Sequence, residues 1–202
     1  MLSTFVVMNS IITDFQLQKL GHTLVFLAKN VGLLNKTKLL KLLFLLEESS
    51  VRKYGRPMLG VPFHVWRLGP VFADIYVNLG EDESPILDEF IKKNQYDPST
   101  YDPNIDFNDD YFSDDEIMLL EDISRFAKNK TASDLIEVTH KKGGLWFNAA
   151  QKNGLLEDFK SKKVTTTDFI IDFSLLFDGD IEKKEYYLES LETYELIQQL
   201  KG

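Results

Sequence analysis

The sequence contains no cysteine and only three histidines among its 202 residues. Without cysteine it can form no disulfide, thiolate nucleophile, zinc finger or iron–sulfur cluster, and such a chain fits a reducing compartment. No window approaches the roughly 18 apolar residues that a membrane-spanning helix needs. The first twelve residues have neither a basic start nor a small-residue cleavage site, so they do not resemble a signal peptide. We therefore expect a soluble, cytoplasmic protein without a membrane partner.

Positive charge is also scarce, because 23 basic residues face 32 acidic ones and the formal net charge is −9. An acidic chain repels phosphate backbones, so we expect no direct nucleic-acid partner. Ten acidic residues fall between Asp97 and Asp122, a segment without Lys or Arg. This segment is either a solvated loop that leads into a helix or a surface for a basic partner.

Motifs for catalysis and metal binding are missing as well. The histidines His22, His64 and His140 are far apart in the sequence, and no H-E-x-x-H, G-x-S-x-G or nucleotide-binding glycine loop occurs. An EF-hand alignment from Asp106 fails, because Tyr111 stands where glycine is required. We expect a non-enzymatic protein without metal or cofactor. The alternatives are a hydrolase-type enzyme using His64 and His140, or a helical regulatory protein.

Helix-start signals are frequent along the chain. A Ser or Thr followed three residues later by an acid or amide forms a capping box, and Asn is also a favourable N-cap. These signals predict helices that begin after Thr13, Asn35, Ser113 and Thr131. A further helix is expected from Ile181 to Leu200. The run Leu39 to Leu46 is apolar around most of its circumference, which places its helix in the middle of the core.

The remaining segments are less regular. Pro70 suits the first turn of a helix that reaches Leu79, and a short helix is expected from Pro85 to Lys93. Short β elements are possible near residues 63–67 or 164–173, where aromatic and β-branched residues gather. The predicted fold is therefore mainly α, a compact single domain over residues 1–202.

The segment from Phe63 to Phe72, FHVWRLGPVF, is the most distinctive in the sequence. Trp66 and Arg67 next to the Gly69-Pro70 turn could form a rigid anchor for a protein partner. Alternatively, the tryptophan fills the core and the turn merely starts a helix. An arginine near the start of a helix is electrostatically disfavoured, so we expect Arg67 to have an acidic partner, either within the fold or as a carboxylate on a partner protein.

Two blocks of this sequence resemble the Panacea domain, the SocA-like antitoxin family that also occurs in phage-associated proteins. The resemblance spans about residues 17–150, whereas residues 154–202 form a C-terminal extension of unassigned role. Leu145 stands where the family often has proline. The resembling segments are Lys38–Phe44, Tyr54–Pro57, Trp66–Val71, Ile75-Tyr76, Phe112–Glu116, Ala132–Leu135, Thr139–Lys141 and Leu145-Trp146.

The resemblance implies a compact helical protein that binds and neutralises a cognate protein toxin, or delivers the toxin to a protease as an adaptor. It does not imply which toxin, because fold and family do not fix the partner. It implies that the partner-binding residues lie in the two resembling blocks. These residues are Trp66, Arg67, Gly69, Pro70, Val71, His140 and Trp146.

Overall fold

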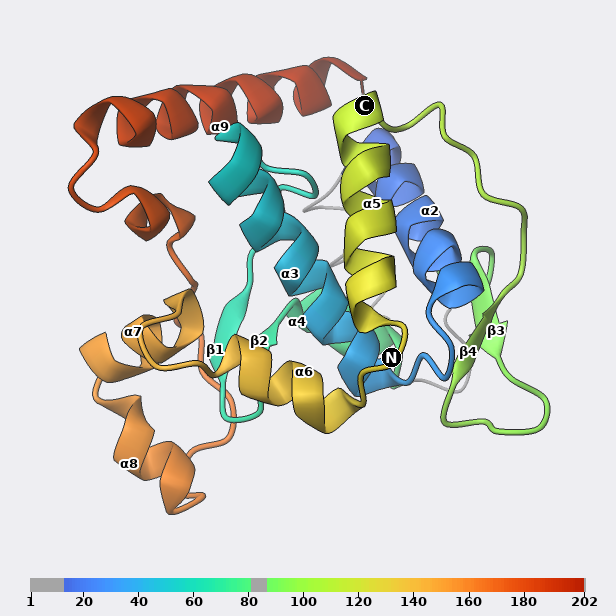
Figure 1. The fold of residues 1–202 in the computed structure, drawn as a ribbon, viewed down its shortest axis with the longest axis horizontal. Coiled ribbons are helices and arrows are strands. Elements are labelled where there is room, and N and C mark those ends of the chain that lie inside the picture. The colour runs from blue at the N-terminus through green and yellow to red at the C-terminus, as the bar shows by residue number, and fades with distance from the viewer. Residues whose placement is uncertain (1–12, 81–86, 202) are drawn as a thin grey trace, which may run out of the picture.

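The computed structural model describes residues 13–80 and 87–201 and shows a mainly α fold (Figure 1). The longer helices are α2 (Asp14–Asn30), α3 (Lys36–Tyr54), α5 (Asp114–Ala127) and α9 (Ile181–Lys201). Shorter helices are α4 (Ala73–Asn78), α6 (Ala132–Thr139), α7 (Leu145–Lys152), α8 (Leu155–Lys160) and the 3-10 helix η1 (Phe173–Phe177). The strands are β1 (His64–Trp66), β2 (Gly69–Val71), β3 (Ile91–Lys93) and β4 (Tyr101–Pro103).

The four helix starts predicted from N-cap signals are confirmed. Thr13 and Thr131 each form a complete capping box, in which the side chains of the cap and of the third helical residue accept from each other's backbone N–H. At Ser113 the Glu116 carboxylate accepts from the backbone N–H of the cap. Asn35 accepts a hydrogen bond from the backbone N–H of Lys38 at 2.9 Å. Local chemistry therefore decides where these helices begin.

Helix α3 lies at the centre of the molecule and packs against α5, α6, β2 and η1 (Figure 1). Its leucines are buried on nearly every side, as the apolar run predicts. The buried polar groups of α3 have hydrogen-bond partners, which offsets the cost of removing them from water. Lys41 donates to the carbonyl of Pro70 at 2.9 Å, and the Glu47 carboxylate accepts from the backbone N–H of Met58, Leu59 and Gly60.

Strands β1 and β2 form a tight antiparallel hairpin in which Val65 pairs with Pro70 and Trp66 with Gly69. The expected strand near residues 63–67 is thus confirmed, but the prediction that Pro70 starts a helix is wrong. Helix α4 begins three residues later, at Ala73. Proline is compatible with a strand that has a free side, and the fixed turn at Gly69 sends the chain back along β1 before the helix starts.

A second hairpin joins β3 and β4, with Ile91 opposite Pro103 and Lys93 opposite Tyr101. The predicted helix from Pro85 to Lys93 is therefore wrong over all of its described residues, because residues 87–90 form a turn and residues 91–93 are held in a strand by their pairing with β4. Pro85 and Ile86 lie outside the described residues. Asn104 continues the contact by donating its backbone N–H to the carbonyl of Phe90 at 2.8 Å.

The segment after α8 runs alongside β1 in an extended conformation. Val65 and Arg67 donate backbone N–H bonds to the carbonyls of Phe169 and Thr165, and a single β-bridge joins His64 to Ile170. The β element expected at residues 164–173 is thus limited to one bridge. The other backbone hydrogen bonds between this segment and β1 do not form a continuous ladder. Its end forms η1, whose Phe173 packs on Phe44 of α3.

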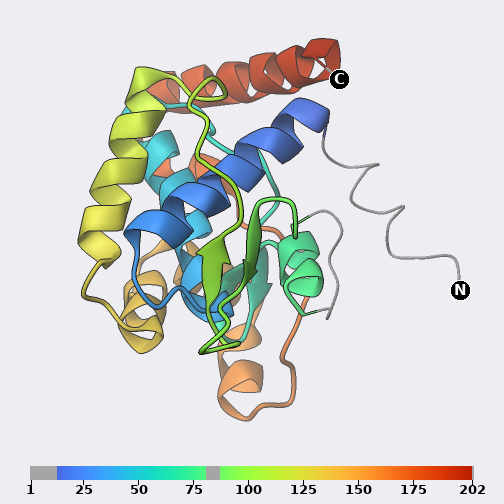
Figure 2. The ribbon, with the colours of Figure 1, turned by 90° about the vertical axis from the view of Figure 1, so that its right-hand side faces the viewer.

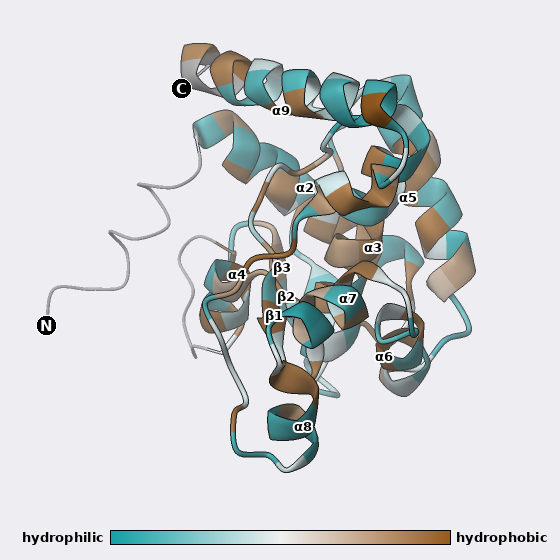
Figure 3. Cartoon of the chain, turned by 90° about the vertical axis from the view of Figure 1, so that its left-hand side faces the viewer, coloured by the Kyte–Doolittle hydropathy of each residue, from teal (hydrophilic) through white to brown (hydrophobic). Residues whose placement is uncertain are grey.

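Helix α9 lies across the end of the molecule at which α2 and α5 begin, as two perpendicular views show (Figures 1 and 2). Helix α8 lies at the opposite end (Figure 3). The Tyr194 hydroxyl of α9 donates to the carbonyls of Met58 and Leu59, and Tyr187 is buried. The hydrophobic core is continuous from Leu20 of α2 to Tyr187 of α9. The C-terminal extension is thus packed onto the same core as the two family blocks.

Candidate functional site

The β1–β2 hairpin holds Trp66 at the molecular surface, half-buried between three segments. Its indole N–H donates to the carbonyl of Thr167 at 3.1 Å. Its ring lies edge-on to the ring of Tyr76 on α4, with 4.9 Å between the ring centroids. Because the side chain is fixed from both sides, Trp66 is a rigid surface feature, which is the property that aromatic anchors of interfaces share.

Three of the other predicted site residues form the buried base of the hairpin. Gly69, Pro70 and Val71 make up β2 and are all buried. Gly69 has a φ of +103°, a left-handed conformation that favours glycine, and a Cβ atom there would meet Lys41 Nζ and His140 Cε1 at 2.8 Å each. The Gly-Pro pair therefore brings the hairpin into close contact with α3 and α6.

His140 and Trp146 contact the backbone of the hairpin. The Trp146 indole N–H donates to the carbonyl of Trp66 at 2.9 Å. His140 Nδ1 lies 2.7 Å from the carbonyl of Ile136, and Nε2 lies 3.4 Å from the carbonyl of Arg67. Burial is the main cause that lowers the pKa of His140, while these two carbonyl contacts raise it. The two residues of the second family block thus fix the hairpin of the first.

The seven predicted partner-binding residues therefore form one cluster, although they come from sequence positions as far apart as 66 and 146. Trp146 and the three residues of β2 are buried, whereas Trp66, Arg67 and His140 are partly exposed. Their role in partner binding stays a prediction. A partner that approaches this cluster would first contact Trp66, Arg67 and the neighbouring exposed side chains.

Arg67 lies in the turn between β1 and β2 and has no acidic partner among the described residues. Of the two expected kinds of acidic partner, one within the fold is thus not found among the described residues, and one on a partner protein stays a prediction. The premise that Arg67 lies at a helix start is wrong, because the following helix begins at Ala73 rather than at Pro70. The buried Nε atom of Arg67 has no hydrogen-bond partner. An unsatisfied buried donor costs free energy. Because Arg67 is partly exposed and forms no ion pair within the described residues, its guanidinium is open to an external acceptor.

A small pocket of about 170 Å³ opens beside this arginine, between α3, the hairpin, α4 and residues 165–166. Lys41 forms part of its wall and is 1% exposed. Burial lowers the pKa of Lys41 to about 7. Lys41 is not among the site residues predicted from the sequence. Its position within the apolar run Leu39 to Leu46 is the signal that could have identified it, because a lysine there must be buried.

Exposed apolar side chains surround the mouth of this pocket. Leu68 at the tip of the hairpin is 52% exposed, and Tyr76 on α4 is 41% exposed. Lys36 Nζ lies 3.7 Å from the centroid of the Tyr76 ring, a cation–π contact. We define the hairpin surface as Trp66, Arg67, Leu68 and Tyr76. It combines apolar contact area with positive charge.

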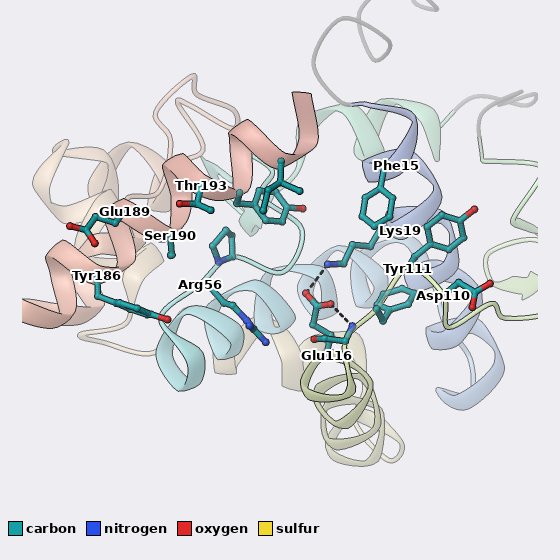
Figure 4. Close-up of a pocket in the computed structure, with 15 residues that line it drawn as sticks. Phe15, Lys19, Arg56, Asp110, Tyr111, Glu116, Tyr186, Glu189, Ser190 and Thr193 are labelled. Atoms are coloured by element: carbon teal, nitrogen blue, oxygen red, sulfur yellow. Dashed lines mark hydrogen bonds and ion pairs between the residues drawn. The ribbon is translucent and has the colours of Figure 1, made fainter. Parts of the chain in front are cut away.

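A larger pocket of about 640 Å³ lies between α9, the first turns of α2 and the start of α5 (Figure 4). Lys19 Nζ lies 2.6 Å from Glu116 Oε1 at its floor, and the second carboxylate oxygen of Glu116 accepts from the backbone N–H of Ser113. Arg56 pairs with Asp115 at its edge at 2.9 Å.

Several polar groups of this larger pocket make contacts within the fold. Glu116 completes the cap of α5, and the Tyr194 hydroxyl already donates to backbone carbonyls. Ser190 Oγ bonds to the carbonyl of Gly55 at 2.7 Å. We therefore interpret these groups as the attachment of α9 to the core, and the hairpin surface remains the stronger candidate site.

The histidines do not form an arrangement known from hydrolases in the described chain. The contacts of His140 are with backbone carbonyls and the ring of Trp146, whose centroid is 3.8 Å away. His64 Nδ1 has no hydrogen-bond partner, although the imidazole lowers the burial-raised pKa of Asp74 through charge. His22 is a buried core histidine, and its Nδ1 accepts from the backbone N–H of Asn108.

Metal-binding clusters and bilayer-spanning helices are both absent from the residues that the structure describes. Among residues 13–80 and 87–201, no group of three or more His, Asp or Glu side chains is placed to hold a metal ion. Within the same ranges, no helix has the length and apolar character that crossing a bilayer requires.

Together, the central apolar helix, the Trp-Arg hairpin and the supporting His-Trp pair define a small helical protein with a surface suited to macromolecular contact. Residues 39–147, more than half of the chain, match the family model of the antitoxin SocA-like Panacea domain. The chain therefore belongs to this family. The match is shorter than the resemblance expected over residues 17–150. Comparisons with curated proteins and with solved structures found no significant match.

Proposed function

We propose that this protein is an antitoxin that neutralises a cognate protein toxin by binding it, and that it has no catalytic activity of its own. Membership of the SocA-like antitoxin family carries the proposal. Family membership supports an antitoxin role and a protein partner in general, whereas the toxin's identity is specific to each member.

The hairpin surface is the proposed contact region. A rigid tryptophan, an unpaired arginine and an exposed leucine lie next to one another on it, and aromatic and arginine side chains dominate the binding energy of protein interfaces. The buried residues Gly69, Pro70, Val71 and Trp146 would act by holding this surface in place. His140 would do the same through its contact with the Arg67 carbonyl.

A growth assay tests the proposal. The protein encoded beside this chain in its genome is expressed in a bacterial host, with and without this chain, since antitoxins are normally encoded next to their toxins. We expect the neighbouring protein to arrest growth and this chain to restore it. Arrest that persists when this folded chain is present at equal or higher level would contradict the proposal.

The same assay distinguishes a direct neutraliser from an adaptor for a protease. An adaptor needs the protease and lowers the amount of toxin, whereas direct binding leaves the toxin intact. Rescue in a host that lacks its energy-dependent proteases, with unchanged toxin level, would indicate direct neutralisation. Loss of rescue in that host would indicate an adaptor.

The hydrolase alternative has a separate test in the double variant His64→Gln, His140→Gln. We expect this variant to restore growth as the unmodified chain does, because binding requires no proton transfer and the glutamine amide at position 140 can still donate to the Arg67 carbonyl that His140 contacts. A variant that folds normally but no longer rescues growth would favour an enzyme that uses these histidines.

A further inference from the structure

The small pocket beside the hairpin has an unusual charge for this molecule. Lys41 and Arg67 contribute to its lining, and no Asp or Glu does so. The remaining lining groups are apolar side chains and threonines of α3 and residues 165–166. The pocket is thus locally positive in a chain of net charge −9, and an anionic ligand would match its charge.

Lys41 brings unused donors to this pocket. Its side chain is 1% exposed, and its Nζ makes one hydrogen bond, to the carbonyl of Pro70 at 2.9 Å. An ammonium group has three N–H donors, so two remain. None of the ion pairs within the described residues includes Lys41. A buried cation without a counter-charge is costly, and a carboxylate would relieve that cost.

Arg67 brings a second unsatisfied donor. Its Nε atom is buried and has no hydrogen-bond partner, while its backbone N–H and carbonyl are engaged with Thr165 and His140. The fold thus fixes the backbone of this arginine, whereas no described residue pairs with its guanidinium. A planar guanidinium with a free edge matches a carboxylate, which it can bind through two parallel hydrogen bonds.

The aromatic surroundings favour a ligand that also has an apolar part. Trp66 and Tyr76 line the pocket.

Lys36 Nζ lies over the Tyr76 ring, 3.7 Å from the ring centroid. A third positive charge therefore stands close to the entrance. It would attract an anion toward the pocket before contact.

We propose that the pocket between α3 and the β1–β2 hairpin binds a carboxylate group presented by the partner protein, held by Lys41 Nζ and the Arg67 guanidinium. The occupant is an acidic side chain or the C-terminal carboxylate of that protein. The proposal rests on the proposed function for the existence of a protein partner, but the pocket's chemistry is tested without that partner.

The size of the pocket supports a single group as occupant. Its volume of about 170 Å³ is below the 300–1,000 Å³ that sites for drug-sized ligands occupy. One side chain or one chain end fits such a space and would serve as a desolvated anchor at the centre of an interface. Burial without a counter-charge lowers the pKa of Lys41. A carboxylate bound beside it would stabilise the ammonium form.

Nuclear magnetic resonance of the whole chain tests the inference. The sequence has two tryptophans, Trp66 and Trp146, so the indole N–H signal of Trp66 can be assigned with a Trp146→Phe variant. Sodium propionate is titrated at constant ionic strength, with neutral propionamide as its isosteric control. We expect a saturable shift of the Trp66 signal with propionate and none with propionamide. Equal shifts with both compounds, or no saturable shift with propionate, would overturn the proposal.

Two peptides identify the source of the carboxylate. Acetyl-Gly-Glu-Gly-amide offers an acidic side chain, and acetyl-Gly-Gly-Gly with a free C-terminus offers a chain end. Binding of either peptide supports a protein-borne carboxylate and says which kind it is. Binding of propionate without binding of either peptide would contradict it and indicate a free small acid as ligand.

Matched variants assign the effect to the pocket. Arg67→Met removes the charge and keeps the stem, and Arg125→Met removes the same charge from an arginine on the surface of α5 that is not part of the pocket. We expect Arg67→Met to weaken carboxylate binding by about tenfold or more and Arg125→Met to leave it unchanged. Equal effects would mean that only net charge matters, which would overturn the site. If Arg67→Met fails to fold, Arg67→Lys replaces it, and loss of binding is again expected because lysine cannot form the bidentate pair.

These outcomes are independent of the antitoxin assay. Carboxylate binding with no rescue of growth would retain the pocket and remove the proposed function. Rescue of growth without carboxylate binding would retain the function and remove the pocket.

Discussion

Gly69 shows how a single residue determines the geometry of the hairpin surface. A methyl group there would collide with Lys41 and His140, and the φ of +103° is itself unfavourable for other residues. We expect Gly69→Ala to lower the free energy of unfolding by about 1–3 kcal/mol or more. Gly143→Ala is the matched control, because Gly143 has a φ of +82° and nothing within 4 Å of a Cβ atom. Urea unfolding should show the larger loss for Gly69→Ala, and equal losses would contradict the collision.

Lys41 gives a pH-dependent prediction at the same scale. Burial lowers its pKa in the folded protein to about 7 from an ordinary value of 10.5. Below pH 7 both the folded and unfolded states hold the proton, so the folded state bears the full cost of a buried charge. Between pH 7 and about 10 the unfolded state holds more protons, so the stability contribution of Lys41 rises with pH, by at most about 1.4 kcal/mol per pH unit.

Unfolding of the unmodified chain and of Lys41→Met at a series of pH values measures this contribution. The difference between the free energies of unfolding of the unmodified chain and of the variant should be constant below pH 7. Above pH 7 it should change in favour of the unmodified chain. The same comparison is repeated in a His140→Gln background, because burial and, to a lesser extent, the charge of Lys41 lower the pKa of His140, and the coupling to Lys41 does not cancel in the difference. Two parallel profiles would show that Lys41 is not buried as the structure has it.

At the scale of elements, α3 is the helix on which the fold depends. Leu43 is 0% exposed in its middle, so Leu43→Ala should lower the free energy of unfolding by about 2–5 kcal/mol through lost burial and a residual cavity. Leu196→Ala on α9 removes the same atoms from a side chain that is 57% exposed, and it should change stability by less than about 0.5 kcal/mol. Thermal unfolding compares the two. An unchanged melting temperature for Leu43→Ala would contradict the central position of α3.

The helices could be predicted from the sequence because their starts are encoded locally. Thr13 and Thr131 satisfy the first free N–H groups of their helices within a few residues, so no distant contact is needed. The hairpins could not be predicted in the same way. Strands of three residues carry almost no periodicity, and Pro70 and Lys93 adopt their conformations through pairing with Val65 and Tyr101.

The candidate site was predictable in part. Trp66, Arg67 and the Gly-Pro turn stand out in the sequence, and their neighbours His140 and Trp146 entered through the family resemblance. The pocket could not be predicted, because Lys41 and Tyr76 come from different helices and meet the hairpin only in the folded chain. Its charge also runs against the acidic composition of the whole.

At the scale of the whole molecule, the absence of an internal partner for Arg67 decides between two readings of that residue. If Arg67 contributed to stability through an ion pair, Arg67→Ala would unfold the protein more easily. Because no such pair exists among the described residues, we expect an almost unchanged melting temperature and a loss of toxin affinity of about 2 kcal/mol or more. Calorimetric unfolding and titration on the same sample check both halves. Unchanged affinity would remove Arg67 from the interface.

The central claim is that this member of the SocA-like antitoxin family acts by binding a protein rather than by catalysis. Light scattering of the purified chain mixed with the purified neighbouring toxin tests it most directly, with an inactive toxin variant where the active one cannot be produced. The account predicts a stable complex of defined mass, formed equally well by the His64→Gln, His140→Gln variant and weakened by Arg67→Ala. Growth rescue without any complex, lost in the histidine variant, would contradict it.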